Sequence, residues 1–147
     1  MNTLKELSEM DLRSKQEKYR NVPEYAIPKK KYSDSDTNSL TQAIIKYLEL
    51  NKFFVTRIQS QGQFSPSLGM WTYGNTVKGI PDLYAQGIIN GKSYALWIEI
   101  KSLSTKDKLR PHQIDVHKRL TEAGAVVFIA KDFDSFMKFY KNLKNDY

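Results

Sequence analysis

Hydrophobic residues recur every three or four positions in four stretches of the chain, a spacing that places them on one face of a helix. These stretches span residues 3–20, 37–51, 111–123 and 133–143. Pro111 suits the first position of the third stretch and Gly124 suits its end. Ile114, His117 and Leu120 define the expected inward face of that helix. The pattern therefore predicts four helices.

Strand patterns fill the intervals between these helices. They cover residues 53–58, 80–86, 92–100 and 125–130. The last is apolar at every position, as in a strand that is covered on both faces and is parallel to its neighbour. Asn90 and Gly91 are the pair favoured in a two-residue type I′ turn, which joins the second and third strands as a hairpin. The order of elements predicts an α/β fold in which helices flank a mixed sheet.

Two segments do not fit this regular order. Residues 1–35 are a predicted helical and extended basic appendage, ahead of a domain at residues 36–147. Residues 59–79 are long for a loop, so they indicate a functional segment, a disordered segment or a hairpin without a clear strand pattern. Their large side chains are expected either to pack the loop onto the sheet or to stack on splayed bases. These side chains are Phe64, Met70, Trp71 and Tyr73.

Composition excludes several classes of chemistry. The 147 residues contain no cysteine, which excludes disulfides, thiolate metal sites and cysteine nucleophiles. His112 and His117 are five residues apart and do not form the i, i+4 zinc pair of a helix. The longest apolar run is short and the N-terminus is charged, so we expect no membrane partner and a cytoplasmic location.

The chain has 23 Lys and Arg residues against 16 Asp and Glu, a formal charge of +7. An excess of this size suits a polyanionic partner such as nucleic acid, although many basic proteins bind none.

The predicted hairpin brings acidic side chains together. A turn at Asn90 and Gly91 sets Asp82 directly opposite Glu99, with Cβ atoms roughly 4.5 to 5.5 Å apart. Lys101 points to the same face because side chains alternate along a strand. Leu83, Ile98 and Ile100 point to the opposite face, as core residues should. The apolar alternation therefore supports this register.

Two carboxylates beside an ammonium group predict a site for a hard divalent cation. Mg²⁺ commonly takes one or two carboxylates together with waters and phosphates, and it activates water for attack on phosphorus. Asp82 and Glu99 are the candidate ligands, and Lys101 is the candidate for orienting that water or neutralising phosphate charge. A surface ion-pair patch of the same three residues is the structural alternative.

Several short motifs carry a family resemblance. They are Gly79-Ile80-Pro81-Asp82, then Trp97-Ile98-Glu99-Ile100-Lys101, then Leu109-Arg110-Pro111-His112-Gln113 and Ala123-Gly124-Ala125. In this order and spacing, over residues 40–133, the chain resembles the PD-(D/E)xK nuclease superfamily. It is most similar to the VRR-NUC branch, whose small stand-alone phage members are similar to Holliday-junction resolvases.

The resemblance implies a restriction-endonuclease-like sheet in an αβββαβα order and a set of site residues. Asp82, Glu99 and the backbone carbonyl of Ile100 would be metal ligands for Mg²⁺, with Mn²⁺ as a substitute. Lys101 would be the catalytic lysine, and Gln113 would position the nucleophile or the metal-bound water. The family often has a glutamate in its first helix, and here Asp36, Asn38 or no residue takes its place.

The implied activity is Mg²⁺-dependent endonucleolytic hydrolysis of DNA, specific for a branched structure such as a Holliday junction or flap. Basic residues near the site would contact the DNA backbone: Lys78, Lys106, Lys108, Arg110, His112, Lys118 and Arg119. Symmetric cutting of a junction requires two active sites, which predicts a homodimer. The alternatives are a nuclease fold that binds DNA or a partner without catalysis, and a restriction-like endonuclease of duplex DNA.

Overall fold

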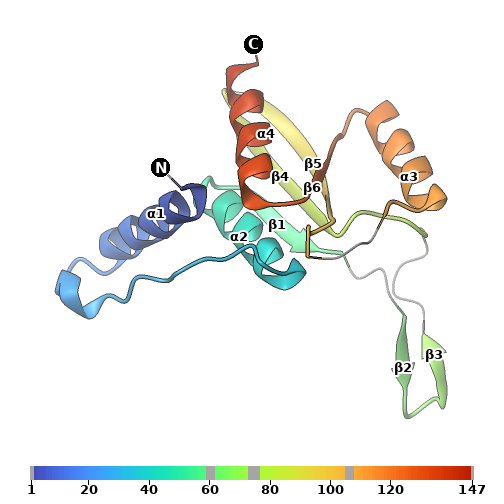
Figure 1. The fold of residues 1–147 in the computed structure, drawn as a ribbon, viewed down its shortest axis with the longest axis horizontal. Helices are drawn as coiled ribbons and strands as arrows, with labels where there is room; N and C mark the ends of the chain where they lie inside the picture. Colours follow the sequence, from blue (N-terminus) through green and yellow to red (C-terminus); the bar gives the residue numbers. More distant parts are fainter. Residues whose placement is uncertain (1, 59–61, 73–76, 105–107, 147) are drawn as a thin grey trace.

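The computed structural model describes residues 2–58, 62–72, 77–104 and 108–146. Its main sheet has four strands in the order β1-β4-β5-β6 (Figure 1). The strands are β1 (Phe54–Arg57), β4 (Leu83–Ile89), β5 (Lys92–Ile100) and β6 (Val126–Ala130). The β1-β4 and β4-β5 pairs are antiparallel and the β5-β6 pair is parallel. The predicted mixed α/β class and the parallel last strand are confirmed.

Helices cover both faces of this sheet. They are α1 (Thr3–Lys18), α2 (Thr37–Leu50), α3 (Pro111–Glu122) and α4 (Phe133–Asn145), with a short 3-10 helix η1 (Glu24–Ala26) after α1. Helices α2 and α4 lie on one side with α1 against them, and α3 lies on the other side (Figure 1). None of the helices within the described ranges is both long and apolar enough to cross a membrane.

The β4–β5 hairpin has the register that the sequence predicts. Its turn residues Asn90 and Gly91 have φ angles of 52° and 80°, the left-handed conformation that a type I′ turn requires. Leu83 and Ile98 are the last pair of the ladder, so Asp82 and Glu99 are the next residues on the two chain segments. Leu83 and Ile98 are completely buried in the core beneath α2 and α4.

Aromatic side chains form the centre of that core. Tyr47 of α2 meets the rings of Phe133, Phe136 and Tyr140 edge to face, with centroids 5.1 to 6.1 Å apart. Such pairs add about 0.5–1.5 kcal/mol each beyond the burial of their area. The helical patterns of α2 and α4 are therefore predicted correctly. The inward face of α3 is partly wrong, because Ile114 is exposed and Val116 is the buried residue.

The segment after β1 contains a second, separate hairpin of two strands, β2 (Gln63–Ser65) and β3 (Met70–Thr72). It projects from the sheet (Figure 1). The prediction that its large side chains pack the segment onto the sheet is wrong for Phe64, Met70 and Trp71, which are 52%, 58% and 69% exposed. Tyr73 lies outside the described residues.

The N-terminal helix is joined to the rest of the protein through a buried carboxylate. Asp11 of α1 is 2% exposed and accepts a hydrogen bond from the hydroxyl of Tyr32 at 2.9 Å. Lys15 of the same helix lies 3.1 Å from Oδ2 of Asp11, and Lys46 of α2 lies 3.6 Å from Oδ1. Burial raises the pKa of Asp11, but these hydrogen bonds and charges outweigh it and the net pKa is lowered.

The predicted domain boundary at residue 35 stays a prediction. Leu7 and Tyr32, which precede it, belong to the same hydrophobic cluster as residues of the sheet.

We predict that the Asp11→Asn substitution lowers the free energy of unfolding by about 2 kcal/mol, because it removes the charge that orders Tyr32 and both lysines. Urea denaturation at pH 7 measures this change. The matched control is Glu9→Gln on the same helix, whose side chain is 44% exposed and lies 3.9 Å from Lys29. An equal loss in both variants would contradict a special role for Asp11.

Candidate functional site

Asp82 is held in place from both neighbouring strands. It follows the buried Pro81 and precedes β4. Its carboxylate oxygen Oδ2 accepts a hydrogen bond from the backbone N–H of Ile100 at 2.7 Å, and its carbonyl accepts one from Ile58 at 2.8 Å. The carboxylate is therefore fixed at the end of β5, next to Glu99.

Glu99 points to the α3 face of the sheet and its side chain is only 3% exposed. Oε1 accepts a hydrogen bond from Nε2 of Gln113 at 3.1 Å and lies 3.8 Å from Nζ of Lys101. Oε2 lies 3.5 Å from Nε2 of His117. A buried carboxylate needs such partners, because desolvation of an uncompensated charge is costly. These contacts come from β5 and α3 together.

Gln113 connects the start of α3 to the sheet. Its Oε1 accepts the backbone N–H of Arg110 at 2.9 Å, which satisfies one of the open groups that precede a helix. Its Nε2 is thereby aimed at Glu99. The same side chain caps the helix and fixes the orientation of the carboxylate.

Lys101 follows directly after β5. Its backbone N–H donates to the carbonyl of Ala130 at 2.9 Å, so the parallel pairing with β6 extends to this residue. The side chain is 9% exposed and lies with Glu99 on the α3 face. The structure thus brings together four of the predicted residues: Asp82, Glu99, Lys101 and Gln113. We call these four residues together with His117 the acid cluster.

His117 is a member of the acid cluster that the sequence predicted on the inward face of α3 but to which it assigned no functional role. It follows Gln113 by four residues, so both side chains lie on the same face of α3 and reach Glu99. This i, i+4 spacing was the signal that could have found it. Burial, followed by the charge of Lys101, lowers the pKa of His117, and Asp82 opposes this shift. The imidazole is therefore favoured in its neutral form.

Gly79 allows the chain to pass close to the start of α3. Its φ is +88°, and a Cβ at this position would lie 2.6 Å from the backbone carbonyl oxygen of His112. Any larger residue would collide with backbone atoms, which cannot move without shifting the helix. Because Asp82 follows three residues later, this contact helps to set the distance between Asp82 and α3.

The candidates for the family's first-helix glutamate have other bonds. Asp36 caps α2, and its two oxygens accept hydrogen bonds from the backbone N–H and the hydroxyl of Ser39 at 2.8 and 2.9 Å. The first of these bonds is the main reason that the pKa of Asp36 is lowered. Asn38 accepts a hydrogen bond from Arg57 at 3.2 Å.

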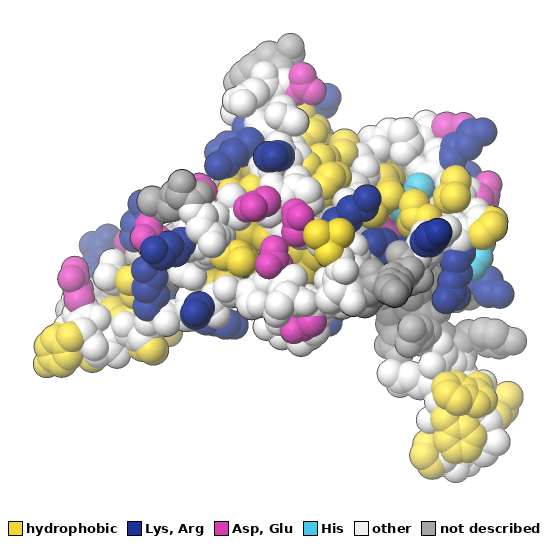
Figure 2. Space-filling model, in the orientation of Figure 1, with side chains coloured by type: hydrophobic (Ala, Val, Ile, Leu, Met, Phe, Trp, Pro, Cys, Tyr) yellow, Lys and Arg dark blue, Asp and Glu magenta, His cyan; other side chains and the backbone are white. Residues whose placement is uncertain are grey.

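The predicted DNA-contacting residues spread around the start and the outer face of α3. Exposed positions are Lys78, Lys108, Arg110, Lys118 and Arg119, and His112 is partly buried. Lys106 lies outside the described residues. Figure 2 shows Lys and Arg side chains gathered at the end of α3 nearest the β2–β3 hairpin.

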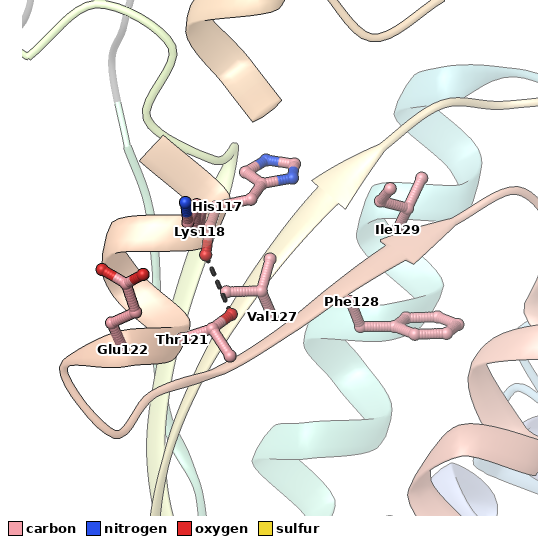
Figure 3. A pocket seen from close by; sticks show the side chains of 7 residues that line it. All are labelled: His117, Lys118, Thr121, Glu122, Val127, Phe128 and Ile129. Carbon is pink, nitrogen blue, oxygen red and sulfur yellow. Dashed lines mark hydrogen bonds between the residues drawn. The ribbon is translucent and has the colours of Figure 1, made fainter. Parts of the chain in front are cut away.

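A shallow hollow of about 420 Å³ lies between α3 and β6. Its lining residues are His117, Lys118, Thr121, Glu122, Val127, Phe128 and Ile129. Figure 3 shows Val127 facing α3 and Phe128 pointing away, where its ring stacks on Phe139 with centroids 4.2 Å apart. His117 is the residue that this hollow shares with the acid cluster.

The donor chemistry of the acid cluster fits a hard divalent cation. Asp82 and Glu99 offer carboxylate oxygens, and cysteine is absent from the whole chain. In the part of the chain that the structure describes, no three His, Asp or Glu side chains gather as they would in an all-protein metal cage. Two carboxylates alone would leave the other positions around an ion such as Mg²⁺ to water and phosphate oxygens, which usually complete its shell.

Comparisons with protein-family models, with curated proteins and with solved structures found no match for this chain.

We predict that Gly79→Ala destabilises the fold by about 1–3 kcal/mol more than Gly91→Ala, because overpacking against backbone adds to the cost of a positive φ. Gly91 is the matched control, since its φ is +80° and a Cβ there meets nothing within 4 Å. Thermal and urea unfolding measure both variants. Equal destabilisation would show that the approach of Gly79 to α3 costs nothing.

We predict that the stability of the wild type falls relative to His117→Gln as the pH drops below about 6.5, the ordinary histidine value. The unfolded chain takes up a proton there before the folded chain does, because the folded pKa is lowered. The free energy of unfolding falls by about 1.4 kcal/mol for each pH unit that separates the unfolded from the folded pKa, and the fall is complete below the folded pKa. Urea unfolding from pH 8 to pH 5 measures it. Above pH 7.5 the difference between the two proteins should be constant, and a constant difference down to pH 5 would contradict the prediction.

Proposed function

We propose that this protein is a metal-dependent endonuclease that hydrolyses phosphodiester bonds in DNA, and that branched or flapped DNA is its substrate. The observation that carries the proposal is the acid cluster. Asp82 just before β4, Glu99 in β5 and Lys101 just after β5 lie near a helix whose glutamine and histidine both reach Glu99. Groups of this kind at one point of a basic protein suit phosphoryl chemistry.

We further propose that the fold is restriction-endonuclease-like. Without the β2–β3 hairpin, the elements after α1 and η1 follow the order α2, β1, β4, β5, α3, β6, α4. The motifs that resemble PD-(D/E)xK nucleases lie at the start of β4, at the end of β5 and at the start of α3. The resemblance and this chain order both support the assignment.

Each member of the acid cluster has a role in this proposal. Asp82, Glu99 and the Ile100 carbonyl would hold Mg²⁺ or Mn²⁺, which when bound polarises a phosphoryl oxygen and lowers the pKa of water. Lys101 would neutralise charge that grows on the scissile phosphate. Gln113 would keep Glu99 in one orientation, as it does through its bond to Oε1. His117, whose pKa is lowered, would leave the carboxylates free of an added positive charge at neutral pH.

The basic surface around α3 would track the DNA backbone. Exposed Lys78, Lys108, Arg110 and Lys118 are placed to contact phosphates rather than to read bases. Binding would then weaken steeply with salt, because each phosphate contact releases counterions. A homodimer is part of the proposal, since paired cuts across a junction require two sites.

One observation favours a second function, DNA binding by a nuclease fold without catalysis. The carboxylate of Glu99 is almost completely enclosed, and its oxygens already have partners from α3 and Lys101. A purely structural network would have this form too. The two functions differ in whether metal-dependent turnover exists.

We predict that the purified protein cleaves four-way junction or flapped DNA with Mg²⁺ and that EDTA abolishes cleavage. Asp82→Asn and Glu99→Gln should remove turnover because they remove ligand charge. Lys101→Met should lower kcat on the order of 10²- to 10³-fold, as is typical when a group that stabilises transition-state charge is lost. Denaturing gel electrophoresis of labelled DNA under single-turnover conditions measures each rate.

Lys138→Gln is the control, because Lys138 is exposed on α4, which covers the face of the sheet opposite α3. It should cleave at nearly the wild-type rate. DNA binding without cleavage of any substrate, in Mg²⁺ or Mn²⁺, would exclude the nuclease and support the binding function. Discrete cleavage of duplex DNA without a branch would instead favour a restriction-like enzyme.

A further inference from the structure

The β2–β3 hairpin carries two aromatic rings that are not part of the hydrophobic core. Phe64 and Trp71 are directly paired across the two strands, with ring centroids 6.0 Å apart in an edge-to-face arrangement. Both rings are more than half exposed. Figure 2 shows the hydrophobic side chains of the hairpin standing clear of the body of the protein. Large apolar side chains exposed together usually mark a contact surface.

The charge around the hairpin indicates what kind of partner it meets. The sequence holds no charged residue between Arg57 and Lys78, so no carboxylate on this segment would repel a phosphate backbone. Both of these basic residues are exposed. Uncharged aromatic rings framed by cations are typical of proteins that stack bases while holding the backbone electrostatically.

The position of the hairpin connects it to the acid cluster. The chain that leaves β3 returns at Gly79 against the backbone of His112, at the start of α3. Lys108 and Arg110 are exposed just before that helix, and Asp82 follows three residues after Gly79. A nucleic acid that reaches the acid cluster across this basic end of α3 would therefore pass beside the hairpin.

We propose that the β2–β3 hairpin stacks an unpaired base on Trp71, and that it thereby selects DNA with a flap, gap or opened junction over continuous duplex. The bases of a duplex are already stacked on each other. The ring of Trp71 can therefore stack only on a base that is unpaired and unstacked. This inference rests on the proposed function, because it takes nucleic acid as the substrate. It specifies which class of DNA the acid cluster receives.

The test measures DNA binding in EDTA, where cleavage does not interfere. Fluorescence anisotropy compares a labelled flapped DNA with a blunt duplex that contains the same sequence. We expect Trp71→Ala to bind the flapped DNA about 5- to 150-fold more weakly, the range for loss of one stacked base. Its affinity for the duplex should stay within about twofold of wild type, as expected if duplex binding is mainly electrostatic.

Two further variants serve as controls. Tyr25→Ala removes an aromatic ring that is 93% exposed in η1, between α1 and α2, and should bind both DNAs as the wild type does. Trp71→Phe keeps the cross-strand ring pair and should retain most of the selectivity for flapped DNA. If Trp71→Ala unfolds the hairpin, tryptophan emission decides the question. Flapped DNA should quench the wild type more strongly than Trp71→Phe, whose remaining tryptophan is Trp97.

Three outcomes would overturn the proposal. They are equal losses of affinity for both DNAs in Trp71→Ala, no loss for either, and a wild-type dimer that Trp71→Ala converts to monomers in sedimentation velocity. The last would make the hairpin a self-association surface. A protein that selects flapped DNA through Trp71 but cleaves nothing with a divalent metal would contradict the nuclease and leave this inference standing. Metal-dependent cleavage by a protein whose selectivity does not depend on Trp71 would support the nuclease and contradict this inference.

Discussion

A two-residue turn at Asn90 and Gly91 determines which side chains of β4 and β5 meet. Because side chains alternate along a strand, a shift of one residue would move Glu99 into the apolar layer and Ile98 out of it. The completely buried Leu83 and Ile98 oppose that shift. The hydrophobic face thus fixes the polar face, and the hydrogen bond from the Ile100 N–H to Asp82 secures the open end of the same hairpin.

Glu99 shows how a buried charge is tolerated beside this hairpin. Its oxygens face an amide, an ammonium group and an imidazole, and the amide is held by the cap of α3. Removing one partner would leave the carboxylate buried with fewer compensating contacts, which costs more than the contact itself contributes. Burial and then the charge of Lys101 lower the pKa of His117, so at neutral pH Lys101 is the cation beside Glu99 and the imidazole is neutral.

The sequence predicts local features well, but it predicts poorly how distant segments of the chain pack against each other. The turn, the register and the mixed sheet follow from residues close together in the chain, and so does the pairing of Asp82 with Glu99. The inward face of α3 was misjudged at Ile114 because the helix packs over polar side chains of β5, which an apolar pattern does not reveal. For Trp71 and Phe64, packing against the sheet was one of two expectations, because large rings usually are buried, yet their hairpin projects from the sheet. The carboxylate of Asp11 gave no sign of burial, since its partners Tyr32 and Lys46 are distant in sequence.

The parallel pairing of β5 with β6 has a consequence for the order of assembly. Antiparallel strands joined by two residues can pair at once, whereas parallel strands must wait until the whole crossover through α3 has closed. The bond between Asp82 and Ile100 belongs to the early, local event, and the contacts of Gln113 and His117 belong to the late one. Because Gln113 and His117 of α3 enclose Glu99, the carboxylate of Glu99 is desolvated only once the crossover that carries α3 has closed.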